Sequence, residues 1–177
     1  MFDVALPAGQ AWIFLPLVVP LALWAIYTDL KDLKILNICV LALFGGFVVL
    51  GPFALPLDEY AWRFAHFGIV LLAGFILSIL GLFGAGDAKF AAAMAPFVVA
   101  SDAFLVMFFV ATSAVAFLIL HRIARRVPAV VNATPHWASW DTGRKSTMKQ
   151  VFPYGLGLST GLIVYMVLGI TQSVPGV

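Results

Sequence analysis

Five stretches of this chain run for 17 to 23 residues without a single Asp, Glu, Lys or Arg, which is the pattern of helices that cross a lipid bilayer. They cover residues 11–27, 35–57, 64–85, 103–120 and 151–170. A helix rises about 1.5 Å per residue, so about 17 to 25 apolar residues cross a hydrocarbon core of ~30 Å. The sequence therefore predicts five long membrane-spanning helices.

The rest of the chain cannot form a separate soluble domain, because 63% of its 177 residues are hydrophobic and only 10% are charged. Soluble domains carry about 25% charged residues. We expect an all-α polytopic membrane protein with one integral membrane domain over residues 1–177. The first ten residues lack a basic cluster, so the first apolar run is expected to stay in place as an anchor and not to be removed as a signal peptide.

A sixth, shorter helix is expected between Lys89 and Asp102. Only 12 uncharged residues lie between them, and these include Pro96. Such a helix would cover ~18 Å of the ~30 Å core. It is therefore expected either to cross with Asp87 drawn below the membrane surface or to be a half-helix.

The basic residues predict the orientation of these six helices, because short cytoplasmic loops carry an excess of Lys and Arg. Nine of the ten basic residues follow helices 1, 3 and 5, and only Arg63 falls on the other side. The nine are Lys31, Lys34, Lys89, Arg122, Arg125, Arg126, Arg144, Lys145 and Lys149. This distribution predicts that both termini are non-cytoplasmic and that Asp29 and Asp87 share the cytoplasmic side.

The long loop at 121–150 holds six of those basic residues together with Trp137 and Trp140. Basic residues beside a membrane are attracted to anionic headgroups, so the loop is expected to lie on the lipid surface. Its thirty residues include Pro128 and Pro135 and resemble no folded basic module, so no nucleic-acid partner is expected.

Two aspartates stand at the ends of apolar runs, Asp29 after the first run and Asp87 in the sequence GAGDAKF. Ionisable groups in such positions usually face a protein interior or a water-filled cavity. Two carboxylates held within a few ångströms do not both ionise, so the pair offers an acid and a base together. This predicts aspartyl protease chemistry, in which one Asp takes a proton from water and the other polarises the scissile carbonyl.

Each aspartate also has a simpler interpretation. Asp87 alone could be the N-cap of the short helix. Asp29 alone could be an interfacial residue near Lys31, and Asp32 is expected to be a solvated loop residue. The glycines of GAGD are expected to let the backbone turn tightly and let a peptide approach closely.

No metal ion and no other cofactor is expected. The three histidines, His66, His121 and His136, are predicted to fall on two different membrane faces, and Cys39 lies inside the second apolar run. No set of three or four ligands with ordinary spacing can be assembled from them. The lone cysteine also excludes an internal disulfide and is expected to be a small buried hydrophobe.

Three stretches of the chain, in order, resemble the motifs of the type IV prepilin peptidases, which are membrane aspartyl proteases of the GxGD type. The residues that carry the resemblance are Asp29, Ile35, Asn37, Gly84, Gly86, Asp87, Lys89, Pro153, Tyr154 and Gly155. Leu36 stands where that family usually has proline. The resemblance implies that Asp29 and Asp87 are catalytic and that the other residues support the site or the substrate.

The family also implies a substrate and a location. The expected partner is a prepilin, made of a short basic leader and an apolar helix, and the expected site faces the cytoplasm at the bacterial inner membrane, among its lipids. The loop over residues 28–34 is short and lacks the cysteines of members that also N-methylate their product. The chain therefore resembles the small single-function members that process Flp (tight-adherence) pilins or archaeal flagellins.

Two other functions are compatible with part of this sequence. Other GxGD intramembrane proteases carry a Tyr-Asp pair and a Pro-Ala-Leu element, whereas this chain has Tyr27-Thr28-Asp29 and Pro153-Tyr154-Gly155. A small transporter or assembly scaffold could use buried acids to carry protons, but the inverted repeat typical of many transporters is not visible.

Overall fold

The computed structural model describes residues 3–140 and 154–172, and within these ranges the chain is helical and contains no strand. The α-helices are α1 (Ala8–Asp32), α2 (Asn37–Ala54), α3 (Leu57–Ile79), α4 (Ala85–Met94), α5 (Ala103–Ala124), α6 (Pro128–Ala133) and α7 (Gly155–Gln172). Short 3-10 turns follow at η1 (Ala95–Phe97), η2 (Ala100–Asp102) and η3 (Ala138–Trp140). The all-α prediction is confirmed.

Five of the described helices, α1, α2, α3, α5 and α7, are long and apolar enough to cross a membrane. The remaining predicted element, α4, has only 10 residues before the chain tightens into η1 at Pro96. The prediction of a short fourth helix is therefore confirmed. Its ~15 Å length at 1.5 Å per residue is half of a hydrocarbon core.

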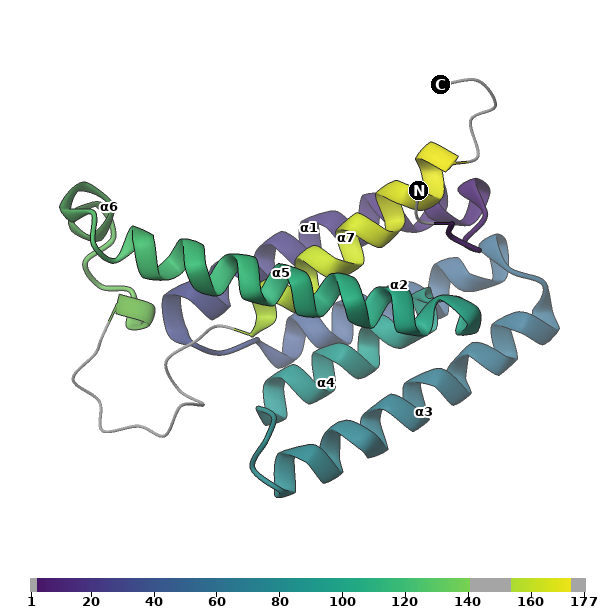
Figure 1. The fold of residues 1–177 in the computed structure, drawn as a ribbon. Coiled ribbons are helices and arrows are strands. Elements are labelled where there is room, and N and C mark those ends of the chain that lie inside the picture. The colour runs from purple at the N-terminus through teal and green to yellow at the C-terminus, as the bar shows by residue number, and fades with distance from the viewer. Residues whose placement is uncertain (1–2, 141–153, 173–177) are drawn as a thin grey trace.

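The most buried helix is α7, which packs against α1 on one side and α5 on the other (Figure 1). The short α4 packs against α2, α3 and α7. Rings of Phe14, Phe47 and Phe97 meet at centroid distances of 5.0 to 6.0 Å and join α1, α2 and η1. Such tilted and edge-to-face pairs are favourable beyond the apolar area that they bury.

Glycines let α7 approach α5 closely. Gly157 and Gly161 form a GxxxG pair, and a Cβ built on Gly161 would lie 2.9 Å from the backbone nitrogen of Val110. A Cβ on Gly157 would lie 2.8 Å from the Cβ of Ala114. Small residues four apart let helix backbones come together in membranes, where packing replaces the hydrophobic effect as the driving force.

Replacing Gly161 with alanine is therefore expected to push α5 away from α7 and to lower the free energy of unfolding by about 1–3 kcal/mol. Gly68→Ala is the matched control, because a Cβ on Gly68 meets nothing within 4 Å. Thermal unfolding of the purified protein in detergent measures both variants. Equal midpoints for the two variants would show that the close approach of α5 to α7 contributes nothing.

The third helix ends earlier than the apolar run predicts. We expected it to reach residue 85, but α3 ends at Ile79 because Gly81 takes a left-handed conformation with φ 77°. Leu82 N–H then donates to Leu77 O at 2.9 Å and Gly81 N–H to Ser78 O at 3.0 Å. This is the Schellman arrangement that terminates helices, and it frees residues 80–84 to lead into α4.

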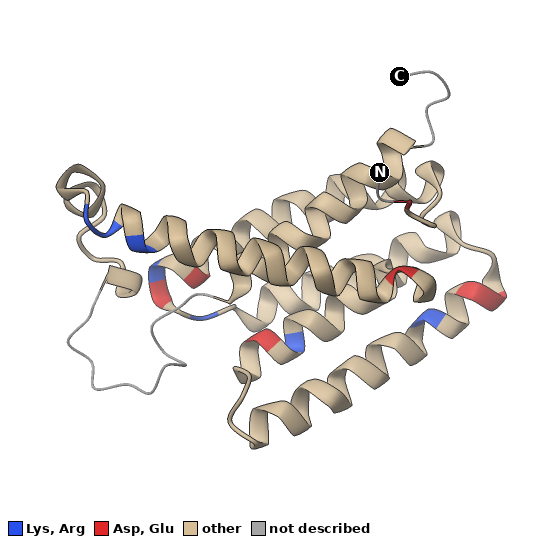
Figure 2. Cartoon of the chain, viewed as in Figure 1, with Lys and Arg blue, Asp and Glu red and all other residues tan. Residues whose placement is uncertain are grey.

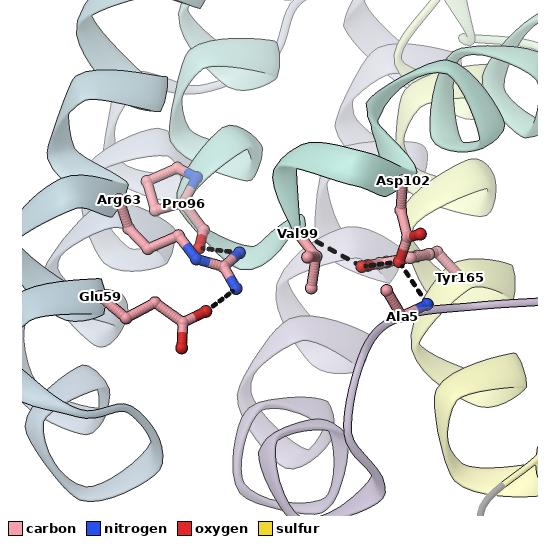
Figure 3. A network of polar contacts seen from close by, with 7 residues as sticks. All are labelled: Ala5, Glu59, Arg63, Pro96, Val99, Asp102 and Tyr165. Carbon is pink, nitrogen blue, oxygen red and sulfur yellow. Dashed lines mark hydrogen bonds and ion pairs between the residues drawn. The ribbon is translucent and has the colours of Figure 1, made fainter.

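Charged residues lie toward the two ends of the bundle, and long uncharged stretches of helix separate them (Figure 2). The end opposite Asp87 holds Arg63, which is only 2% exposed and pairs with Glu59 at 2.6 Å. Its guanidinium also donates to the carbonyl of Pro96 at 3.3 Å, beyond the C-terminal end of α4 (Figure 3). Paired and hydrogen-bonded in this way, a buried arginine is tolerated.

A second polar group at this end ties the termini to the bundle. The Asp102 carboxylate accepts hydrogen bonds from Ala5 N–H and from the Tyr165 hydroxyl, both at 2.9 Å (Figure 3). Val4 N–H donates to the Gln172 side chain at 2.8 Å. The first and last described residues therefore lie at the same end of the molecule.

Candidate active site

Asp29 lies in the last turns of α1 and not after it. We expected helix 1 to end at residue 27, but it continues to Asp32, because Thr28 and Asp29 are buried against the bundle. Asp29 is only 4% exposed, and its Oδ2 accepts a hydrogen bond of 2.7 Å from the Gly155 N–H at the start of α7. The fold thereby joins two of the three motif stretches across 126 residues of sequence.

Asp87 lies in the first turn of α4. The helix begins at Ala85 with Gly84 as its N-cap, so the interpretation of Asp87 as the N-cap is wrong. Asp87 is three residues beyond the cap, and its side chain reaches back to the Gly84 backbone, as in half of a capping box. A Cβ on Gly84 would collide with the Asp87 carboxylate, which explains why a glycine stands there.

The expectation that both glycines of GAGD make a tight turn is not met. Among the described glycines only Gly81 has a positive φ. Gly84 is extended, with φ −71° and ψ 141°, and Gly86 lies inside α4. A Cβ on Gly86 would meet Ile35 at an ordinary 3.9 Å. Gly84 is therefore required by the position of Asp87, and the chain turns at Gly81.

The two aspartates come together at one end of the bundle, close enough for the charge of Asp87 to act on Asp29. Ile35, 8% exposed, packs between the elements that carry them. Its side chain would lie 3.0 Å from a Cβ on Gly155, and its backbone faces Gly86. The link between α1 and α2 thus fixes the spacing of α4 and α7 around the carboxylates.

That link turns at Leu33, which has φ 52° and is the one non-glycine residue with positive φ in the described part of the chain. Such a conformation usually needs support from the surrounding structure. Leu36 follows with φ −69°, the value that a proline ring imposes. Leu36 therefore has the φ that a proline at this position would need.

Two of the supporting motif residues also meet. Lys89 Nζ donates to Asn37 Oδ1 at 3.4 Å, so the start of α4 contacts the start of α2. Tyr154 is exposed beside Gly155, and Pro153 lies outside the described residues. Asp32 is exposed as predicted, but it is the last residue of α1 and not a loop residue. The Lys89–Asn37 hydrogen bond links α4 to α2 two residues beyond Asp87.

Asp87 is partly buried, and its carboxylate lies against the Gly84 backbone. Burial of a carboxyl beside a second carboxyl favours its protonated form. A proton shared between two neighbouring carboxyls belongs to the pair and not to either residue. The site can therefore present one acid and one base at once.

An aromatic stack that the sequence did not reveal lies near Asp29. Trp137 and Trp140 are parallel at 6.1 Å, Trp140 stacks on the buried His121 at 4.9 Å, and Trp137 packs edge-on against Tyr27 of α1. The two tryptophans therefore pack on the bundle. Contact of this loop with lipid headgroups stays a prediction. Residues 141–150 of that loop fall outside the described residues.

Other titratable groups are not gathered at this site. No group of three His, Cys, Asp or Glu side chains within residues 3–140 and 154–172 could hold a metal ion. Cys39 is buried in α2, as predicted, and its thiol donates to Leu21 O at 3.2 Å. Asp29 and Asp87 are the two carboxyl groups that the described part of the chain brings together at this site.

Comparison with protein-family models, with curated proteins and with solved structures gives no match for this chain. What the site does is therefore inferred from its own residues.

Proposed function

We propose that this protein is a membrane aspartyl endopeptidase that removes the short basic leader of type IV prepilins of the Flp class. The observation that carries the proposal is the pairing of Asp29 and Asp87, which are 58 residues apart in sequence and share one site in which Asp29 is buried and Asp87 is partly buried. The resemblance of the three motif stretches to prepilin peptidases supports it, because residues from all three stretches line this site.

In the proposed reaction a water molecule between the carboxylates attacks the scissile carbonyl. The ionised aspartate takes a proton from this water, while the protonated one donates a hydrogen bond to the carbonyl oxygen and stabilises its developing charge. The proton is then passed to the leaving amine, and the pair returns to its starting state. The Gly155 N–H that holds Asp29 keeps one carboxylate oriented throughout.

The proposal places the site at the cytoplasmic face of a bacterial inner membrane, with six crossings and both termini outside. In support, Asp29 and Asp87 lie at the end of the bundle where α1 and α5 end and α4 begins (Figure 1), and these helix ends carry Lys31, Arg122 and Lys89. The short α4 would complete the sixth crossing together with η1 and η2.

Single cysteines test this orientation. A cysteine placed between residues 121 and 140 is expected to react with a membrane-impermeant thiol reagent only from the cytoplasmic side, and a cysteine at Asp58 only from outside. The native Cys39 is buried and gives little background. Labelling with the reverse polarity would place both aspartates away from a leader that is still in the cytoplasm.

Two alternative functions predict different products from a prepilin. Another GxGD intramembrane protease would cut within an apolar helix and not next to a basic leader. A transporter or scaffold would leave a precursor intact. Incubation of the purified protein with an Flp-type prepilin, followed by mass spectrometry of the product, separates the three.

A further inference from the structure

We infer that a lateral groove between α3 and α5 receives the apolar helix of the polypeptide substrate and guides its cytoplasmic end to Asp87. This inference rests on the proposed function. The groove is a cavity of about 450 Å³, whose walls come from α3 and α5 and whose floor comes from α4, η1 and Leu158 of α7. Figure 1 shows the short α4 between these two longer helices.

The groove exists because α3 and α5 pack on different partners. α3 packs against α4 and η1, where Gly74 lets the backbone of Ala88 approach to 3.2 Å from a Cβ built on that glycine. α5 packs against α7 at the GxxxG pair. Between them stand only ten residues of α4 and the 3-10 turns, which are too short to fill the depth of the bundle.

One face of α4 leads from the groove toward the candidate active site. Asp87, Ala91 and Met94 are spaced at i, i+4 and i+7, which places them on one side of a helix. Ala91 and Met94 line the groove. Ala91 is four residues beyond Asp87, about 6 Å along the helix axis. The groove therefore ends about one helical turn from the residue that carries the carboxylate.

The lining favours a helix over other occupants. It is apolar apart from His66, and small residues stand on three of its elements, including Ala91, Ala95 and Ala103. Small side chains let a helix backbone approach closely, and close packing is what holds helices together in lipid. Two of the lining residues, Ala103 and Ala111, are exposed on α5 and open to the bilayer, so a membrane-embedded helix can enter from the side.

Crosslinking tests the occupant directly. A photoreactive amino acid is placed at Ala111, which lines the groove, or at Ala116, which is exposed on the same helix outside it. Both are made in the Asp87→Asn background, so that bound precursor is not consumed. We expect an adduct with the apolar helix of an Flp-type prepilin from position 111 and not from position 116. Lipid adducts alone, or equal prepilin adducts from both positions, would overturn the inference.

Kinetics give the second test. Ala111→Phe fills the groove from an exposed position and should leave the core intact. It is expected to lower kcat/KM for the whole precursor by about tenfold relative to a leader peptide that spans the scissile bond but carries only the first few residues of the apolar helix. Ala116→Phe should show no such change in this ratio. An unchanged ratio for Ala111→Phe contradicts the groove, even where the protein cleaves both substrates.

The two hypotheses fail differently. Wild-type protein that cleaves neither the precursor nor the leader peptide contradicts the proposed function. The crosslinking result then still decides whether the groove holds a polypeptide helix. If both substrates are cleaved but position 111 gives no adduct, the proposed peptidase function stands and the inference about the groove is contradicted.

Discussion

Replacing either Asp29 or Asp87 with asparagine is expected to lower prepilin cleavage by about 10²- to 10⁴-fold, because each change removes the acid or the base of the pair. Asparagine keeps nearly the same shape, so insertion and folding should persist. Residues that act as one unit have non-additive effects. The double variant should therefore be no less active than either single variant.

Asp32→Asn is the matched control, because Asp32 is exposed at the end of the same helix as Asp29. It should stay within a few-fold of wild type. Rates are measured on purified protein, with the melting temperature of each variant as a check on folding. If either single variant cleaved the prepilin as fast as wild type, the replaced carboxylate would not be the acid or the base of the reaction.

Adding one methyl group at Gly155 is expected to lower kcat/KM by about 10²-fold. A Cβ at this position would lie 2.7 Å from Asp29 Oδ2 and 3.0 Å from the Ile35 side chain, so the carboxylate must move. A displacement of about 1 Å at a catalytic group can lower the rate by about that factor. The hydrogen bond from the Gly155 N–H that orients Asp29 would be distorted as well.

Gly45→Ala provides the comparison, because a Cβ on Gly45 of α2 meets nothing within 4 Å. Its kcat/KM should match that of wild type. The ratio of the two variants isolates the effect at the site from any general effect of alanine in a helix. A Gly155→Ala variant as active as Gly45→Ala would show that Asp29 does not need its present position.

The helices could largely be predicted, because apolar runs without charge have few alternatives in a bilayer. Their ends could not. Asp29 extends α1 because Gly155, 126 residues away, gives its carboxylate a buried hydrogen-bond partner. α3 ends early because of a left-handed conformation at Gly81, which the surrounding apolar run conceals.

The sequence predicted which residues form the candidate site, but not how their side chains and backbone are arranged. The distribution of basic residues predicted that Asp29 and Asp87 lie at the same membrane face, where they can form one site. The role of Gly84 depends on which way the Asp87 side chain turns, and the wedge formed by Ile35 depends on the turn at Leu33. The stack of Trp137 on Trp140 needs the loop after α5 to fold back onto α1, for which the sequence offers no periodic signal.

The central claim, that these two aspartates cut a prepilin leader, is tested most directly by product mapping. Purified wild-type protein in lipid vesicles is incubated with an Flp-type prepilin, and the new N-terminus is identified by mass spectrometry. We expect a single cut between the basic leader and the apolar helix, and no cut with Asp29→Asn or Asp87→Asn. An intact precursor, a cut within the apolar helix, or the same cut made by both variants would contradict the assignment.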